Sequence, residues 1–189
     1  MLAAERGITV TDLGYRRATT LAIAHHPQLA ELVAANGLFC GLAGHARHHP
    51  HTDLVVWMSQ RDCQHKWGRV IQAHGFGRWR DHHSEVGFFL HHHPQQQPIK
   101  ALISVLAGYD TLAQAIPKLA TNLLLVWLNR LDQEATLHRL VPPRPYLVAT
   151  ATPHHGADPA EAIWWPLSST GPRRRLADLP YDRAASTRP

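Results

Sequence analysis

A strand–helix–strand unit in the middle of the chain constrains the fold more than any other feature. The runs 85–90 and 122–128 predict two β-strands, the second of them apolar enough to be buried on both faces. Between them, apolar residues recur every three or four positions, at Ile99, Leu102, Ile103, Leu106, Tyr109, Leu112 and Ile116. This spacing predicts an amphipathic helix. Because a helical crossover joins parallel strands, the two strands should be parallel and lie in one sheet.

Further elements extend this unit on both sides. We expect a helix, two strands and a hairpin turn before it, at residues 27–48, 54–58, 69–73 and 81–84, with a polar connection at 61–68. After it we expect a helix, two strands and a short helix, at 131–140, 146–150, 162–167 and 173–179. The resulting α-β-β-β-α-β order is that of the restriction-endonuclease-like, PD-(D/E)XK core. The predicted fold class is therefore α/β, with a mixed central sheet flanked by helices.

Composition limits the broad class of protein. The 189 residues fit one domain, and 44% hydrophobic residues can build a core. We expect a linker or the remnant of an upstream region at 1–24, one α/β domain at 25–180 and a disordered tail at 181–189. No secretion signal is evident at the start, and the apolar run 123–128 is too short to span a bilayer. These features predict a cytoplasmic protein without a membrane partner.

Charge bears on the partner. Lys and Arg outnumber Asp and Glu by 19 to 14, which gives a formal charge of +5. Such a balance favours a polyanionic partner such as DNA, although a basic surface that only serves solubility is an equal alternative. Two basic groups are the candidate nucleic-acid contacts: Arg78, Trp79 and Arg80, where the indole could stack on a base, and Arg173, Arg174 and Arg175.

Several short segments between His25 and Leu179 resemble the replication-relaxation proteins of bacterial plasmids and mobile elements. They include VVWMSQ at 55–60, VIQAHGFGRW at 70–79, EVGFFLHHH at 85–93 and ALISVLAGYDTLA at 101–113. The resemblance implies a nuclease-like core and a role in plasmid or mobile-element DNA replication or transfer. It also implies a winged-helix DNA-binding region ahead of this domain, which here would be missing or supplied by a separate DNA-binding or replication protein.

The departures from the family pattern fall on the expected active site. His74 stands where the family has the Asp of a Pro-Asp-Gly, and residues 91–93 (His-His-His) replace a Glu-Tyr-Asp. Gln60 takes an acidic position, and the Lys position of the next helix falls near Val105. Phosphodiester cleavage with Mg²⁺ needs anionic oxygen ligands, which imidazole and amide groups do not supply. The resemblance thus implies a degenerate site at Gln60, His74, His91 and His93.

The histidines themselves allow two interpretations. His91 and His93 point to the same face of a strand, and His74 at the end of the neighbouring strand could converge with them. Three imidazoles could bind Zn²⁺ or Ni²⁺. Alternatively, they replaced carboxylates in a site that no longer does chemistry, and we favour this interpretation, with no cofactor expected. The predicted function is a DNA-associated, catalytically inactive replication-relaxation protein; the alternatives are a metal-dependent nuclease with His ligands and a protein–protein interaction module.

Overall fold

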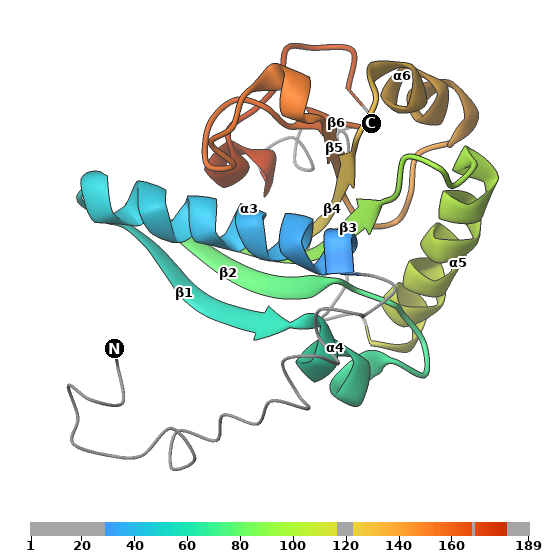
Figure 1. Ribbon diagram of the computed structural model, residues 1–189, viewed down its shortest axis with the longest axis horizontal. Coiled ribbons are helices and arrows are strands. Elements are labelled where there is room, and N and C mark those ends of the chain that lie inside the picture. Colours follow the sequence, from blue (N-terminus) through green and yellow to red (C-terminus); the bar gives the residue numbers. More distant parts are fainter. Residues whose placement is uncertain (1–28, 117–122, 168, 181–189) are drawn as a thin grey trace.

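The computed structural model describes residues 29–116, 123–167 and 169–180. Its centre is a six-stranded mixed sheet in the order β1-β2-β3-β4-β5-β6 (Figure 1). The strands are β1 (Thr52–Ser59), β2 (Gly75–Asp81), β3 (Ser84–His93), β4 (Leu123–Leu128), β5 (Val148–Ala151) and β6 (Trp165–Pro166). The first three are antiparallel, β4 and β5 continue parallel to β3, and β6 is antiparallel to β5. The predicted α/β class with a mixed sheet is confirmed.

Helices cover both faces of the sheet (Figure 1). On one face α3 (Leu29–His48) packs together with the C-terminal segment that contains the 3₁₀ turn η3 (Leu176–Asp178). On the other face lie α4 (Gln60–Trp67), α5 (Ile99–Ala115) and α6 (Leu131–Leu140). The strand β4 contributes alternate leucines to the two cores, so the prediction that it is buried on both faces is confirmed.

The helix α3 is long and apolar enough to cross a membrane by length and composition alone. In the structure it behaves as the core helix of an α/β layer, since Leu38, Phe39 and Leu42 are buried against the sheet. Phe39 lies directly over Gly75 and Gly77 of β2, where a Cβ atom would stand 2.4 Å and 2.9 Å from its ring. The two glycines therefore serve close packing of helix on sheet rather than a turn or bulge.

The prediction of a second strand at residues 69–73 was wrong. Residues 69–73 form a connection, and the strand begins at Gly75. The segment expected to be a polar connection is instead α4, whose first turn is closed by a capping box. The Ser59 hydroxyl accepts a hydrogen bond from the Asp62 backbone N–H, and the Asp62 carboxylate accepts one from the backbone of Ser59. Ile71 and Ala73, which suggested a strand, are buried as loop residues.

Other boundaries differ less. The helices at 99–115 and 131–140 and the hairpin turn at 81–84 are confirmed. The fifth strand covers residues 148–151, the predicted edge strand has only two residues, and the predicted last helix is a single 3₁₀ turn. The predicted linker at 1–24 and tail at 181–189 lie outside the described residues.

Candidate functional site

The candidate site lies where β1 and β3 end and β2 begins. In the antiparallel meander these three strand ends meet at one edge of the sheet, because Ser59 pairs with Gly75 and Gly75 pairs with Leu90. Gln60 follows β1, His74 precedes β2 and His91 to His93 end β3. The predicted convergence of His74 with the β3 histidines is therefore present, and the ring centroids of His74 and His91 are 5.0 Å apart.

The three histidines of β3 divide between the two faces of the sheet. Alternate residues of a strand point to opposite faces, so His91 and His93 share the face of Phe89 and α5. His92 shares the face of Leu90 and α3. All three are buried. The sequence pattern pointed to His91 and His93 only. Strand alternation by itself places His92 on the opposite face, toward α3.

Glu31 is the residue of this site that the sequence analysis missed. It lies in the first turn of α3, and one carboxylate oxygen is 3.6 Å from Nε2 of His74. Its charge also acts on His92 and His93, whose pKa it raises slightly against the dominant effect of burial. Glu31 is separated from His74 by more than forty positions along the chain, and only the packing of α3 on the sheet brings the two together.

Burial keeps the imidazoles neutral. Desolvation lowers the pKa of His74 to about 4 and that of His91 to about 3, with a smaller contribution to His91 from the neighbouring histidines. Desolvation also lowers the pKa of His92 and His93. At neutral pH the site therefore has four uncharged rings next to one carboxylate.

Hydrogen bonds define where the protons sit. The backbone N–H of His92 donates to Nδ1 of His74 over 3.2 Å, so the lone pair of Nδ1 is engaged and the His74 proton lies on Nε2, toward Glu31. His93 donates from Nε2 to the carbonyl of Gln97 over 3.1 Å. The Asn129 amide lies 3.4 Å from Nε2 of His92, and neither ring nitrogen of His91 makes a hydrogen bond of normal geometry.

This proton arrangement bears on metal binding. A histidine that binds a metal usually donates its other ring N–H to a carboxylate or carbonyl. His74 does the reverse, because its second nitrogen accepts a backbone N–H. The ring centroids of His91 and His93 are 6.3 Å apart. Within the described residues, His74, His91 and His93 do not form a group whose ligand atoms all lie within 4.8 Å of one another.

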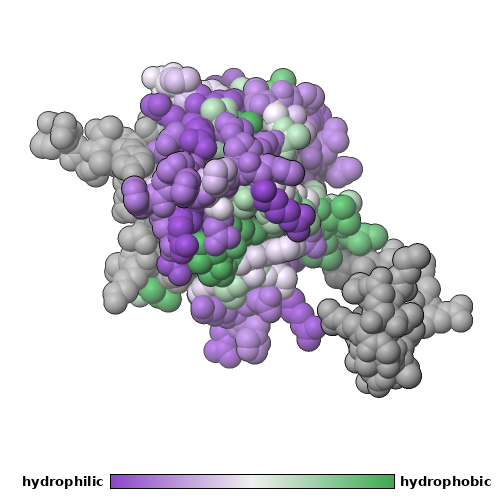
Figure 2. All heavy atoms as spheres, turned by 90° about the vertical axis from the view of Figure 1, so that its left-hand side faces the viewer, coloured by the Kyte–Doolittle hydropathy of each residue, from purple (hydrophilic) through white to green (hydrophobic). Residues whose placement is uncertain are grey.

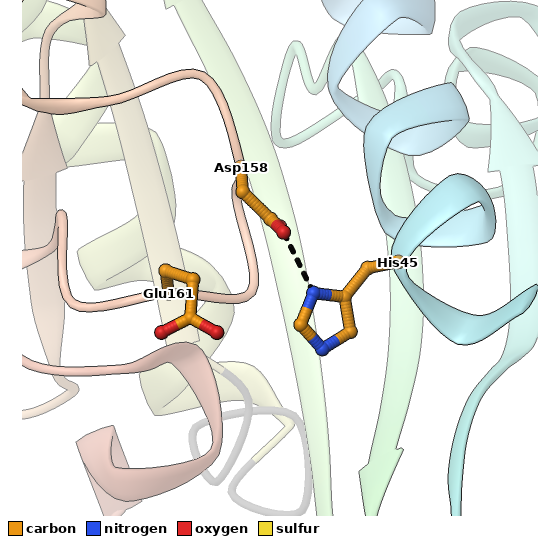
Figure 3. Close-up of side chains that lie close together, drawn as sticks. All are labelled: His45, Asp158 and Glu161. Atoms are coloured by element: carbon orange, nitrogen blue, oxygen red, sulfur yellow. Dashed lines mark hydrogen bonds and ion pairs between the residues drawn. The ribbon is translucent and has the colours of Figure 1, made fainter. Parts of the chain in front are cut away.

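One group in the described part of the chain does meet that distance criterion. This group lies where α3 faces the C-terminal segment (Figure 3). It consists of His45 of α3 and of Asp158 and Glu161 of the C-terminal segment. Nδ1 of His45 is 2.7 Å from an Asp158 carboxylate oxygen, which is a direct hydrogen bond. Two ligand atoms of one zinc ion stand about 3 Å or more apart, given Zn–ligand distances of about 2 Å. The hydrogen bond between His45 and Asp158 therefore joins α3 to the C-terminal segment directly, without a metal ion between the two side chains.

A groove opens beside the histidine site. A cavity of about 520 Å³ is lined by Leu32, Gln60, Arg61, Gln64, Gly68, Gln72 and Ala73. Gln60 belongs to both the groove and the strand-end site, and Leu32 and Ala73 are the chain neighbours of Glu31 and His74. The Oε1 atom of Gln60 is buried there without a hydrogen-bond partner. The groove thus offers amide groups and one guanidinium group to a polar ligand.

The predicted nucleic-acid residues are mostly engaged inside the protein. Trp79 is fully buried against α3, so the hypothesis that it stacks on bases was wrong. Arg78 and Arg80 are half-exposed, and both pair with Glu85. Arg173 binds the buried Glu134 through two hydrogen bonds.

The other two arginines of the C-terminal cluster are also tied to the fold. Arg175 binds Asp81 at 2.9 Å. The backbone of Arg174 pairs with that of Trp164 through hydrogen bonds of 2.7 and 3.2 Å.

The fold and site define a mixed α/β protein with a polar, imidazole-rich site at one edge of a helix-flanked sheet. A family model described as replication-relaxation matches residues 2–124, about two thirds of the chain. The chain therefore belongs to the replication-relaxation family. The match contains Glu31, Gln60 and the four site histidines, and it ends before Arg173. No curated protein and no solved structure matches the chain.

Proposed function

We propose that this protein acts in plasmid or mobile-element DNA replication or transfer, and that its core associates with DNA in the cytoplasm without cleaving it. Family membership supports the process. The observation that carries the absence of cleavage is the donor set of the site: four neutral imidazoles, three of them buried, beside Glu31. A separate DNA-binding or replication protein would supply sequence specificity.

The arrangement of elements supports a nuclease-like ancestry. The order α3, β1, β2, β3, α5, β4 is the α-β-β-β-α-β order of the PD-(D/E)XK core, with α4 as an addition between the first two strands. The first three strands form an antiparallel meander and the crossover through α5 returns parallel to β3. The site lies at the strand ends where the resemblance places the degenerate residues.

The chemistry of these residues disfavours Mg²⁺. This ion takes oxygen ligands, keeps several waters and is held by carboxylates together with substrate phosphates. Glu31 alone offers one carboxylate, and the lone pair of His74 is already engaged by a backbone N–H. Val105 occupies the region where the resemblance places a catalytic lysine. The Mg²⁺ ion would not be held here, and no lysine stands at this position of the helix to replace its charge.

Three free cations near the groove lie on α4 and the loop after it. Arg61, Lys66 and Arg69 are exposed, and no ion pair involves them among the residues that the structure describes. Arg61 also lines the groove, together with Gln60 of the candidate site. Exposed cations that are not neutralised by the protein release counterions when they meet phosphates, which favours association. We therefore assign the main phosphate contacts to this helix rather than to the arginines of β2.

The test compares two double variants with the same change of net charge. We expect Arg61→Ala/Arg69→Ala to weaken binding to a duplex of random sequence and to flatten the plot of log affinity against log salt by about 2. The matched control, Arg78→Ala/Arg80→Ala, should change both quantities less because both arginines already pair with Glu85. Fluorescence anisotropy over a salt series measures both. Binding that is absent, or independent of salt, would contradict DNA association and favour a protein–protein module.

A metal-dependent nuclease with His ligands is the second candidate. It is favoured by the buried ring nitrogens of His91, which make no hydrogen bond of normal geometry, and by Nδ1 of His93, which makes none either. Elemental analysis of untagged protein tests it. One Zn²⁺ or Ni²⁺ per chain that disappears in His91→Ala/His93→Ala would support this candidate over the inactive core.

A further inference from the structure

A second group of histidines lies at the opposite end of the β1–β3 meander. His51 precedes β1, and His82 and His83 form the turn between β2 and β3. Together with Thr52, Asp53 and Arg80 they line a cavity of about 450 Å³. Figure 2 faces the end of the molecule where α3 ends and β1 begins, and this face is mostly hydrophilic. The family resemblance and the proposed DNA contacts use none of these histidines.

A carboxylate fixes the orientation of His82. Its Nδ1 is 2.7 Å from a carboxylate oxygen of Asp81, which can only accept a hydrogen bond, so the imidazole proton lies on Nδ1. The lone pair is then on Nε2, on a side chain that is 66% exposed. Asp81 is buried and is held in turn by Arg175. A carboxylate behind the imidazole is the usual support of a metal-binding histidine, and it is the opposite of the arrangement at His74.

The distance between two rings fits a shared ion. Two imidazoles bound to one tetrahedral zinc ion at about 2 Å place their ring centroids about 5 Å apart. The centroids of His51 and His82 are 5.3 Å apart, with an angle of 40° between the ring planes. The backbone N–H of His82 donates to the carbonyl of His51 over 2.8 Å and holds the two residues next to each other.

Both residues have an unusual backbone. His51 and His82 have φ angles of 73° and 54°, and they are the non-glycine residues with positive φ in the described part of the chain. Histidine, like asparagine and aspartate, is among the non-glycine residues found most often in this region. Both histidines therefore occupy tight turns that present their side chains at the same end of the sheet.

We propose that His51 and His82 bind one Zn²⁺ ion, with water completing the coordination. The cavity gives the ion access from solvent. The guanidinium of Arg80, which also lines the cavity, is directed to Glu85 at 3.3 Å, a carboxylate that it shares with Arg78. The bound ion ties the start of β1 to the β2–β3 turn, so it stabilises the end of the sheet farthest from the DNA groove.

The test is equilibrium binding of ZnCl₂ to the untagged full chain, followed by calorimetry and by thermal unfolding. We expect one saturable site per chain and a higher Tm with Zn²⁺. His51→Asn and His82→Asn should each weaken Zn²⁺ binding at least about ten-fold, because asparagine tolerates positive φ and removes only the imidazole. Asp81→Asn should weaken binding by about ten-fold through the lost support of His82.

Two controls separate this site from others. His65→Asn removes an exposed histidine of α4 and should leave Zn²⁺ binding unchanged. His91→Ala/His93→Ala should also leave it unchanged, which distinguishes the turn from the strand-end histidines. The absence of saturable binding would overturn the proposal. So would unchanged binding in correctly folded His51→Asn and His82→Asn, with folding checked by circular dichroism.

Discussion

Replacing Arg173 with alanine is expected to lower the free energy of unfolding by about 3 kcal/mol or more. This is the largest effect of a single substitution that we predict. The guanidinium donates to both carboxylate oxygens of Glu134, at 3.1 and 2.5 Å, and Glu134 is only 2% exposed. Without Arg173 this carboxylate stays buried with one neutral hydroxyl donor, Thr150, and His155 at 3.4 Å. An uncompensated buried charge is what makes the loss large.

Urea unfolding at neutral pH measures this effect. Arg130→Ala is the matched control, because Arg130 also pairs with a carboxylate of α6, Asp132, but both partners are exposed. We expect little change there, since exposed pairs contribute little. Equal stability of the two variants would show that the Arg173–Glu134 pair does not hold the C-terminal segment to α6.

The second large effect is acid destabilisation by the strand-end histidines. In the unfolded chain a histidine has a pKa near 6.5, whereas burial lowers the pKa of His91 to about 3 and that of His74 to about 4. Between these values the unfolded chain binds protons that the folded one does not. These histidines therefore do not lower the free energy of unfolding above about pH 6.5. They lower it progressively as the pH drops from there toward 4. Each such imidazole should cost roughly 1–2 kcal/mol between pH 7 and pH 5.

His91→Leu tests the assignment of this effect. Leucine replaces a ring whose nitrogens have no hydrogen bond of normal geometry, so little should be lost at pH 7. At pH 5 the variant should be more stable than the natural chain. The same substitution at His65, which is exposed on α4, is the control. A natural chain equally stable at pH 5 and pH 7 would contradict the burial of neutral imidazoles at this site.

Hydrophobic periodicity was sufficient to predict most of the fold. The apolar repeat of α5 continues over the whole helix, and β4 is an unbroken apolar run. Both are strong signals because many residues contribute to each. The eight residues of α4 are mostly polar, so the apolar period is weak, and the helix is marked instead by Ser59 and Asp62 in capping-box spacing. That signature was present in the sequence, at Ser59 and Asp62.

Of the candidate site, only the residues at the ends of strands could be predicted from the sequence. His74 and His91 follow from the meander, because the start of β2 lies beside the end of β3. Glu31 comes from a helix whose docking no local pattern specifies. The burial of Trp79 could have been inferred from its neighbours, since Arg78 and Arg80 occupy the exposed face of the same strand and alternation sends Trp79 inward.

Plasmid integrity in the DNA-bound state tests the central claim most directly. Supercoiled plasmid would be incubated with excess untagged protein at low salt, with Mg²⁺, Mn²⁺ or Zn²⁺ present, and then deproteinised and resolved on a gel. We expect plasmid that is retarded before deproteinisation and still supercoiled after it, with every metal. Nicked or linear plasmid that forms with one metal, and no longer forms with His91→Ala/His93→Ala, would contradict it and identify an active nuclease.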